Sequence, residues 1–363
     1  MTKDFWKFRA GQIVSQLGDI AAMSALSAYI VTTYHDVGVL GFMYGGIGGA
    51  MLVSNFFLGS LVDFVDKKHF LTKVDVLRGL IYFIVALGLF LHWGNVVFSV
   101  SLVALSATLA GVFQPASTAY VTELVPREEI GKALSQSQVL GGIGGILGGG
   151  LSFLLLKYAS VEVCFFFNSA SFLIAAYVTS KTENSTPRGD LVPRSLFRAL
   201  VQVNPFKNYS IVGRIKSFRT LLFLMVSINF IMGVGAMCVS SLIVTRAMPI
   251  EIFGLNASSQ MLGGLLGASV NMGMKRSELR KMKGAVSCLL VSFGLLLVPQ
   301  LFCIQLYLFL MGFFGSIILL NAQSVQYKEV GVGMRGAASS LNSVATRLSY
   351  YASQSLFGFI NQK

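Results

Sequence analysis

Charged residues inside apolar stretches are the first candidates for chemistry in this sequence. Asp19 lies within an apolar stretch over 9–33. A carboxylate in apolar surroundings is costly unless it is paired or protonated, and loss of water favours its neutral form. Asp19 is therefore predicted to bind a proton or to contact a ligand. The alternative is a structural carboxylate that is hydrogen-bonded to neighbouring helices or faces a water-filled cavity.

Arg347 is the matching cation, within an apolar stretch over 337–359. A guanidinium stays charged, so Arg347 must face a cavity or a carboxylate. Two hypotheses follow: Arg347 binds an anionic ligand, or it pairs with Asp19. Tyr350 lies within one turn of Arg347 and is predicted to line the same surface. Four amides in apolar stretches are further candidates for ligand contact, although each alone more often joins helices: Gln16, Gln114, Gln138 and Asn229.

A second charged group surrounds the loop that follows the second apolar stretch. Its members are predicted to form a gate on the inner side: Gly59, Asp63, Asp66, Lys67, Lys68, Asp75, Arg78 and Arg335. Asp63 is predicted to accept hydrogen bonds from the start of the 337–359 helix, because backbone N–H groups there attract negative charge. The alternative is a solvated loop. Asp75 and Arg78, one turn apart, are predicted to pair with each other.

The sequence lacks the residue patterns of an enzyme or a metal site. All four cysteines lie inside apolar stretches and form no CxxC pair, which is typical of buried apolar residues. The three histidines are far apart, and neither a GK[ST] phosphate loop nor a pair of catalytic carboxylates is present. We therefore expect no enzyme activity, no metal, no cofactor and no ATP drive.

Composition indicates a membrane protein built from helices. Of the 363 residues, 54% are apolar and only 12% are charged, whereas a soluble domain has about 25% charged residues. A helix needs roughly 20 apolar residues to cross a bilayer. Eleven spans are predicted, at 9–33, 39–62, 70–92, 96–120, 133–156, 160–180, 220–244, 249–273, 284–300, 302–324 and 337–359.

The distribution of positive charge predicts the orientation of these spans. With the N-terminus inside, 23 of the 28 Lys and Arg residues fall in segments predicted to lie inside, and 3 in segments predicted to lie outside. Short cytoplasmic loops carry this excess in membrane proteins. The net charge of +13 is thereby explained by contact with anionic lipid rather than by nucleic acid. We expect a multi-pass protein of the inner (cytoplasmic) membrane with a cytoplasmic N-terminus.

An internal repeat predicts two related halves. The glycine, short polar residue and basic pair of Gly59–Lys68 recur in Gly267–Arg276. A polar linker at 182–219 separates a six-helix bundle at 1–181 from a five-helix bundle at 220–363. A second half as long as the first would need a further span, so a twelfth helix is apparently missing. Either the chain is truncated, or it is an eleven-span variant whose C-terminus lies outside.

Several segments of this sequence resemble motifs of the major facilitator superfamily. Within that superfamily, they most resemble the branch of drug and siderophore exporters that includes macrolide efflux pumps and the enterobactin exporter. The resemblance rests on these segments: Ser15–Asp19, Gly59–Lys68, Asp75–Arg78, Pro115 and Glu123–Glu128. Two features depart from the family pattern. Phe64 replaces a basic residue of the loop signature, and the glycine-rich span at 133–156 lacks the Gly-Pro pair of antiporters.

The resemblance implies an all-α polytopic fold of two pseudo-repeated bundles that works by alternating access. It implies that the span at 133–156 packs on 249–273, and 39–62 on 337–359, through small residues such as Gly141, Gly45 and Gly263. The leading hypothesis for function is a secondary transporter that exports an amphiphilic small molecule, drug-like or siderophore-like, in exchange for protons. The alternatives are an importer or a lipid or metabolite transporter of the same fold, and a non-transporting relative that acts as a receptor or scaffold.

Overall fold

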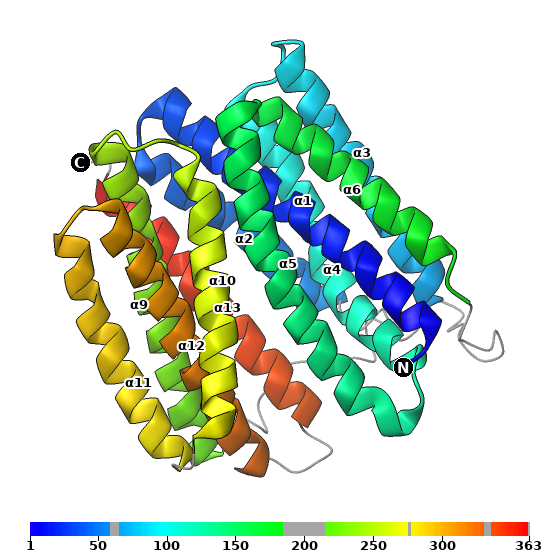
Figure 1. The fold of residues 1–363 in the computed structure, drawn as a ribbon, viewed down its shortest axis with the longest axis vertical. Helices are drawn as coiled ribbons and strands as arrows, with labels where there is room; N and C mark the ends of the chain where they lie inside the picture. The colour runs from blue at the N-terminus through cyan, green and yellow to red at the C-terminus, as the bar shows by residue number, and fades with distance from the viewer. Residues whose placement is uncertain (59–64, 184–214, 275–276, 330–334, 362–363) are drawn as a thin grey trace. The chain divides into compact units, whose positions relative to one another are not determined.

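The computed structural model describes residues 1–58, 65–183, 215–274, 277–329 and 335–361. Over these residues the secondary structure is helical, without strands, and Figure 1 shows the helices in order. Eleven α-helices lie within the described residues: α1 (Lys3–Tyr34), α2 (Val37–Leu58), α3 (Lys67–Phe90), α4 (Val96–Glu123), α5 (Ile130–Tyr158), α6 (Val161–Ser180), α9 (Lys216–Thr245), α10 (Ile252–Gly273), α11 (Glu278–Ser292), α12 (Leu301–Glu329) and α13 (Arg335–Asn361).

Each predicted span corresponds to one of these helices, so the prediction of eleven helices is confirmed for the described residues. The largest difference concerns the span predicted at 284–300. The structure has α11 over Glu278–Ser292, followed by a 3-10 helix over Phe293–Leu297. The helical segment ends shortly before Pro299, because the residue that precedes a proline is pushed out of the helical conformation. Within the described residues, seven helices are long and apolar enough to cross a membrane: α1, α2, α4, α5, α6, α9 and α12.

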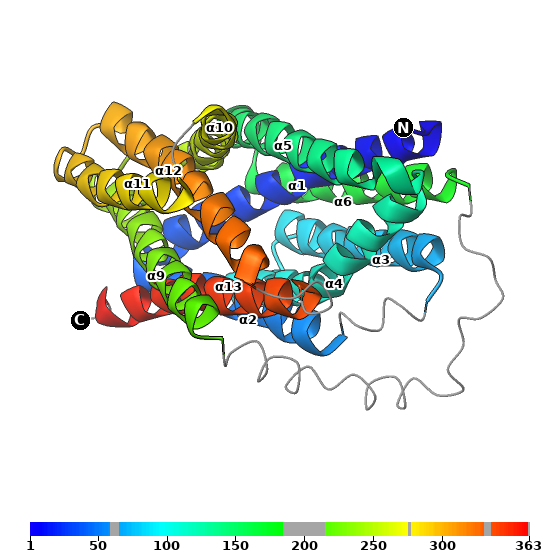
Figure 2. The same cartoon turned by 90° about the horizontal axis from the view of Figure 1, so that it is seen from below.

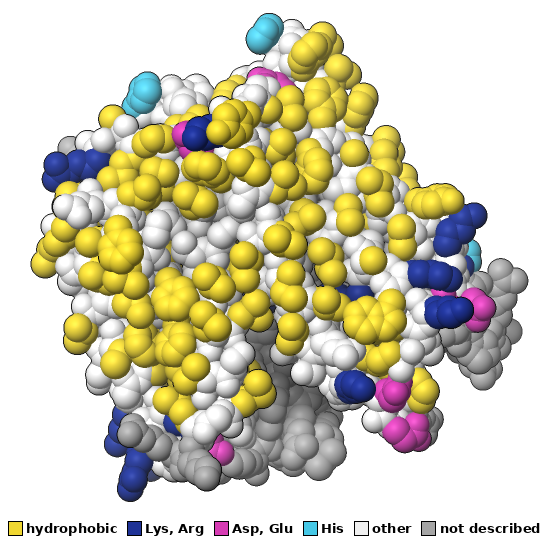
Figure 3. Space-filling model, viewed as in Figure 1, with side chains coloured by type: hydrophobic (Ala, Val, Ile, Leu, Met, Phe, Trp, Pro, Cys, Tyr) yellow, Lys and Arg dark blue, Asp and Glu magenta, His cyan; other side chains and the backbone are white. Residues whose placement is uncertain are grey.

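Side chains are distributed on α3 in the manner expected in lipid. Leu80 and Phe90 are exposed, at 50% and 63% of their surface, whereas Asp75 and Arg78 on the same helix are buried. Charged side chains are almost never fully buried in water-soluble proteins unless they are paired, and in membranes they turn toward the interior of a bundle. Figure 3 shows hydrophobic side chains over the middle of the helices, with Lys and Arg toward helix ends.

The chain forms two compact units. The first comprises 1–33, 49–203 and 253–255, and the second 34–48, 204–252 and 256–363. In the first unit α3 packs along α6 and against α4; in the second, α9 packs against α13 and α11 against α12. Figures 1 and 2 show these pairs side by side. The first part of α2 thus belongs to the second unit, and the division of the chain at 182–219 stays a prediction.

Glycines allow helix backbones to approach closely in the second unit. A Cβ atom at Gly41 or Gly45 would overlap the carbonyl oxygen of Gln354 or the hydroxyl of Ser355, both on α13. The predicted packing of the second span on the eleventh is confirmed by these contacts.

The predicted packing of the fifth span on the eighth is confirmed at Gly254, where an added Cβ atom would overlap the backbone of Gly149 and Phe153 on α5. Gly263, which was predicted to take part in this contact, does not.

Gly263 and Gly267 lie against α12, where a Cβ atom would overlap the carbonyl oxygens of Phe309 and Phe313. Small residues permit close approach, but they do not specify which neighbouring helix approaches. Gly148, on α5, instead packs on α1, where an added Cβ would lie 2.9 Å from the end of Ile20.

Replacing Gly263 by alanine should separate α10 from α12 and lower the melting temperature of the detergent-solubilised protein. The obstacle is the backbone carbonyl of Phe309, which no rotamer change can move, so we expect a loss of about 1–3 kcal/mol, as for other overpacked sites. The neighbouring Gly264 is a matched control, because the nearest atom to its added Cβ is 3.9 Å away. If G263A melts at the same temperature as G264A, the α10–α12 packing described here is incorrect.

Candidate functional site

Four helices of the first unit bring a charged cluster together. Arg78 on α3 donates from Nη2 to Oδ1 and Oδ2 of Asp19 on α1, at 3.1 and 3.0 Å. Its Nε donates to the hydroxyl of Ser106 on α4 at 3.0 Å. From α6, the amide of Asn168 donates to Oδ1 of Asp19 at 3.4 Å. The carboxylate and the guanidinium are thus each held by a second polar group.

Close approach of α1 and α6 places Asp19 in this cluster. A Cβ atom on Gly18 would lie 2.9 Å from the Cα of Asn168, so only a glycine lets the two helices come this near. On α6, the ring of Phe172 lies under the guanidinium of Arg78, 4.1 Å from its centroid, and a cation over an aromatic face is attracted to it. The hydroxyl of Ser169 donates to the carbonyl of Gly79 at 2.8 Å and ties α6 to α3.

The two ends of the ion pair differ in accessibility. The side chain of Arg78 is 8% exposed, whereas that of Asp19 is 34% exposed. Arginine remains charged under all ordinary conditions, so the guanidinium is a fixed buried cation. The accessible carboxylate can therefore accept a proton or contact a ligand, while the arginine holds it in place.

The predicted pairing of Asp75 with Arg78 is wrong, because Arg78 turns to Asp19. Asp75 is fully buried, and neither of its carboxylate oxygens is hydrogen-bonded to a described residue. It faces the amide of Gln12 on α1, but the two do not meet hydrogen-bond geometry. Residues one turn apart share a helix face, yet the long arginine side chain reaches Asp19 on α1 and Ser106 on α4. Asn168 on α6 adds a hydrogen bond to the carboxylate of Asp19.

Of the other predicted ligand contacts, one joins two helices. The amide of Gln16 donates to the carbonyl of Gly141 on α5 at 2.8 Å. Gln114 and Gln138 are exposed on α4 and α5. Asn229 lines a cavity in the second unit.

Arg347 is exposed on α13, and the structure pairs Asp19 with Arg78 rather than with Arg347. The ring of Tyr350 lies edge-on to Tyr351, with the centroids 5.8 Å apart.

Three predicted gate residues make contacts at helix ends within the first unit: Asp66 within α3, and Lys67 and Lys68 to the ends of other helices. The carboxylate of Asp66 accepts from the backbone N–H of His69 at 3.0 Å and so caps α3. Burial opposes its ionisation, but this bond and the His69 ring outweigh burial and hold the pKa of Asp66 below its usual value. Lys67 pairs with Glu123 at 2.6 Å, and Lys68 donates to the carbonyl of Thr182 at 2.5 Å.

Gly59 and Asp63 lie outside the described residues, as does the side chain of Arg335. The predicted latch between Asp63 and the start of the last helix therefore stays a prediction.

Ser106 and Phe172 were not predicted to belong to the site. A serine and a phenylalanine are ordinary residues in an apolar helix, so their types carried no signal. Asn168 is an amide within a predicted span, which is a usable signal for interhelical hydrogen bonding.

Comparison with known proteins decides the family. Residues 10–353 match the family model of the Major Facilitator Superfamily. The chain belongs to this superfamily. It is accordingly a multi-pass membrane protein, as predicted.

Relatives of the superfamily at higher identity match one part of the chain. A protein of Bacillus subtilis named "Putative bacilysin exporter BacE" is 32% identical over 174 residues, which are 47% of this chain and 42% of the relative. Its counterpart in Bacillus amyloliquefaciens is 30% identical over the same length. The match thus covers less than half the length of these relatives.

Solved structures of the superfamily share the fold. The nucleoside transporter NupG superposes with a TM-score of 0.73 at 14% identity, covering 99% of this chain and 91% of that one. A D-xylose–proton symporter gives a TM-score of 0.68 at 14% identity, with 98% and 90% covered. At such identities the likeness extends to the fold alone.

Asp19→Asn and Asp75→Asn should have opposite effects on stability. D19N removes the countercharge of a buried guanidinium, and we expect it to cost about 1–3 kcal/mol, less than a fully buried pair because Asp19 is partly exposed. D75N replaces a carboxyl that makes no hydrogen bond with an uncharged group of the same shape, so the melting temperature should hold or rise. Thermal unfolding in detergent measures both. A loss in D75N as large as in D19N would mean that Asp75 is the true partner of Arg78.

Proposed function

We propose that the protein is a secondary transporter that exports an amphiphilic small molecule in exchange for protons. The proposal rests on family membership and above all on the Asp19–Arg78 ion pair inside a helical bundle. Ionisable groups within membrane spans commonly mark proton and substrate pathways. Two features depart from the family pattern and bear on proton antiport: Phe64 replaces a basic residue, and α5 lacks the Gly-Pro pair of antiporters. A direct test of proton coupling is therefore the decisive experiment.

Export is the direction favoured by the relatives. The matched Bacillus proteins carry the name of a putative bacilysin exporter, although one structural neighbour is named a D-xylose–proton symporter. We further propose the inner membrane and a cytoplasmic N-terminus, on the excess of Lys and Arg in the segments on that side.

Exchange of partners by Arg78 would couple protons to movement. Asp19 on α1 and Asp75 on α3 both lie near the guanidinium, and the phenol of Tyr82 is the third titratable group beside it. When Asp19 takes up a proton, the guanidinium loses its countercharge and the carboxyl of Asp75 becomes its nearest replacement. The rearrangement shifts α3 relative to α1, so that the protonation state selects the conformation of the bundle.

Transport in proteoliposomes under an imposed pH gradient tests this function. Bacilysin, a macrolide, a cationic dye and a catecholate siderophore are the probes. We expect movement of at least one to require the gradient and to be abolished by an uncoupler. D19N should abolish gradient-driven movement, because it removes the group that binds the proton.

Asp4→Asn is the matched control for this experiment, since Asp4 lies near the start of the same helix, where it pairs with Lys7 at 2.9 Å and accepts from the backbone N–H of Glu183 at 3.3 Å. D4N should transport as the unmodified protein does. Undiminished gradient-driven transport by D19N would refute the coupling role. If folded protein moves none of the probes, the receptor or scaffold alternative gains support. Probe uptake in the direction of proton flow would favour the importer.

A further inference from the structure

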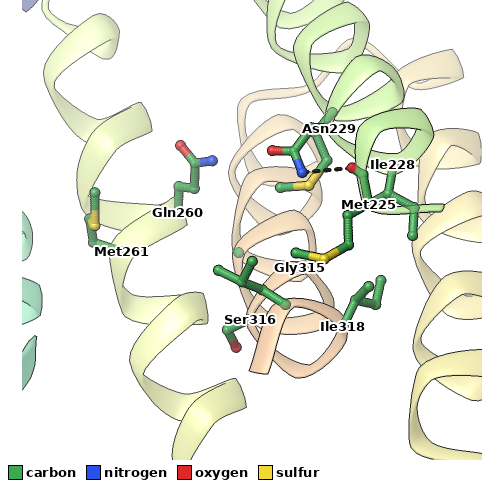
Figure 4. A pocket seen from close by; sticks show the side chains of 11 residues that line it. Met225, Ile228, Asn229, Gln260, Met261, Gly315, Ser316 and Ile318 are labelled. Carbon is green, nitrogen blue, oxygen red and sulfur yellow. Dashed lines mark hydrogen bonds between the residues drawn. The ribbon is translucent and has the colours of Figure 1, made fainter. Parts of the chain in front are cut away.

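The second unit contains a cavity of about 270 Å³ between α9, α10 and α12. Figure 4 shows Met225 and Asn229 entering it from α9, Gln260 from α10, and Gly315 at its wall on α12. Met232 also lines it. A cavity of about 150 Å³ is sufficient to hold benzene, so this one has room for a larger ring system.

Two glycines of α12 shape the wall of this cavity. A Cβ atom at Gly315 would lie 2.9 Å from the terminal methyl of Met232. One at Gly312 would overlap the backbone oxygen of Gln260, so α12 and α10 are in close contact there. The wall on α12 therefore has no side chain at these positions. The flexible thioether of Met232 can move within the space that Gly315 leaves.

The lining is uncharged and mainly apolar. Methionine side chains are flexible and polarisable, and they adapt to apolar ligands of different shape. The amide of Asn229 donates to the carbonyl of Met225 at 2.8 Å, which fixes the side chain. No hydrogen bond joins the carboxamide of Gln260 to a described residue. The hydroxyl of Ser316, also in the lining, donates to the carbonyl of Phe313 at 3.0 Å. Gln260 is therefore the lining residue whose donor and acceptor both remain available to a ligand.

We propose that this cavity binds an uncharged aromatic or branched aliphatic group that carries a single hydrogen-bonding atom for Gln260. The inference deepens the proposed transport function, on which it rests, by naming the substrate class: the apolar end of an amphiphile. A sugar or nucleoside presents many hydroxyl groups, and each would lose hydrogen bonds to water in this lining. A charged group would find no countercharge among the residues that line the cavity.

Equilibrium binding of two matched dyes to the full-length protein in phosphatidylcholine nanodiscs tests the proposal. N-phenyl-1-naphthylamine is uncharged and has one N–H donor; 8-anilino-1-naphthalenesulfonate has the same rings and a sulfonate. We expect saturable fluorescence enhancement with the uncharged dye, above that of empty nanodiscs, and none with the sulfonate.

Two variants test the place of binding. Gly315→Leu fills the cavity and should weaken binding of the uncharged dye about tenfold or more. Gly284→Leu is its matched control, because an added Cβ there meets no atom within 4 Å. Gln260→Leu keeps the volume but removes the hydrogen bond and should weaken binding several-fold, which keeps the test decisive if G315L does not fold.

Unchanged affinity in both G315L and Q260L, or equal binding of the sulfonate, would overturn the proposal. Saturable dye binding in detergent that is lost in nanodiscs would mean that a lipid acyl chain occupies the cavity. This result would overturn the proposal as well. The test requires no transport. If G315L loses dye binding but the unmodified protein shows no flux, the transport function alone is refuted. If the unmodified protein shows flux but G315L binds the dye as well as it does, this site alone is refuted.

Discussion

The guanidinium of Arg78 sets the constraint that organises the first unit. It cannot lose its charge. It is buried on α3, a helix that exposes apolar side chains such as Leu80 and Phe90. A charge in these surroundings must be paired and hydrogen-bonded, and three helices meet the requirement with Asp19, Ser106 and the ring of Phe172. The packing of α1, α4 and α6 around α3 therefore satisfies one cation, and the close approach at Gly18 follows from the need to bring Asp19 and Asn168 to it.

A buried carboxyl beside this pair makes the arrangement asymmetric. Asp19 has Arg78 and Asn168 as partners, whereas Asp75 has no hydrogen bond within the described residues. A structure selected only for stability would gain from an uncharged residue at Asp75, since isolated buried polar groups are costly. The position of this buried carboxyl near Arg78 is consistent with the proposed exchange of ion-pair partners.

The two units offer different chemistry. The first presents a charged cluster with a partly exposed carboxylate. The second has an uncharged cavity lined by methionines and by the carboxamide of Gln260, which bonds to no described residue. The proposed amphiphilic substrate would present a group suited to each of these two environments. Glycines contribute to both units. Gly18 and Gly263 allow helix backbones to approach closely, and the missing side chain at Gly315 leaves space in the cavity.

The sequence by itself determined where the eleven helices of the described residues lie, because crossing a bilayer requires a fixed length of apolar residues. It also indicated the superfamily through short motifs. It identified Asp19 and Asn229 as polar groups in apolar surroundings, and Arg78 as a member of the predicted gate. Only the tertiary structure decided the partners. Helical periodicity defines which residues share a face, but it contains no information on which helix that face meets. For this reason Arg78 pairs with Asp19 rather than with Asp75 one turn away, and Gly263 packs on α12 rather than on α5.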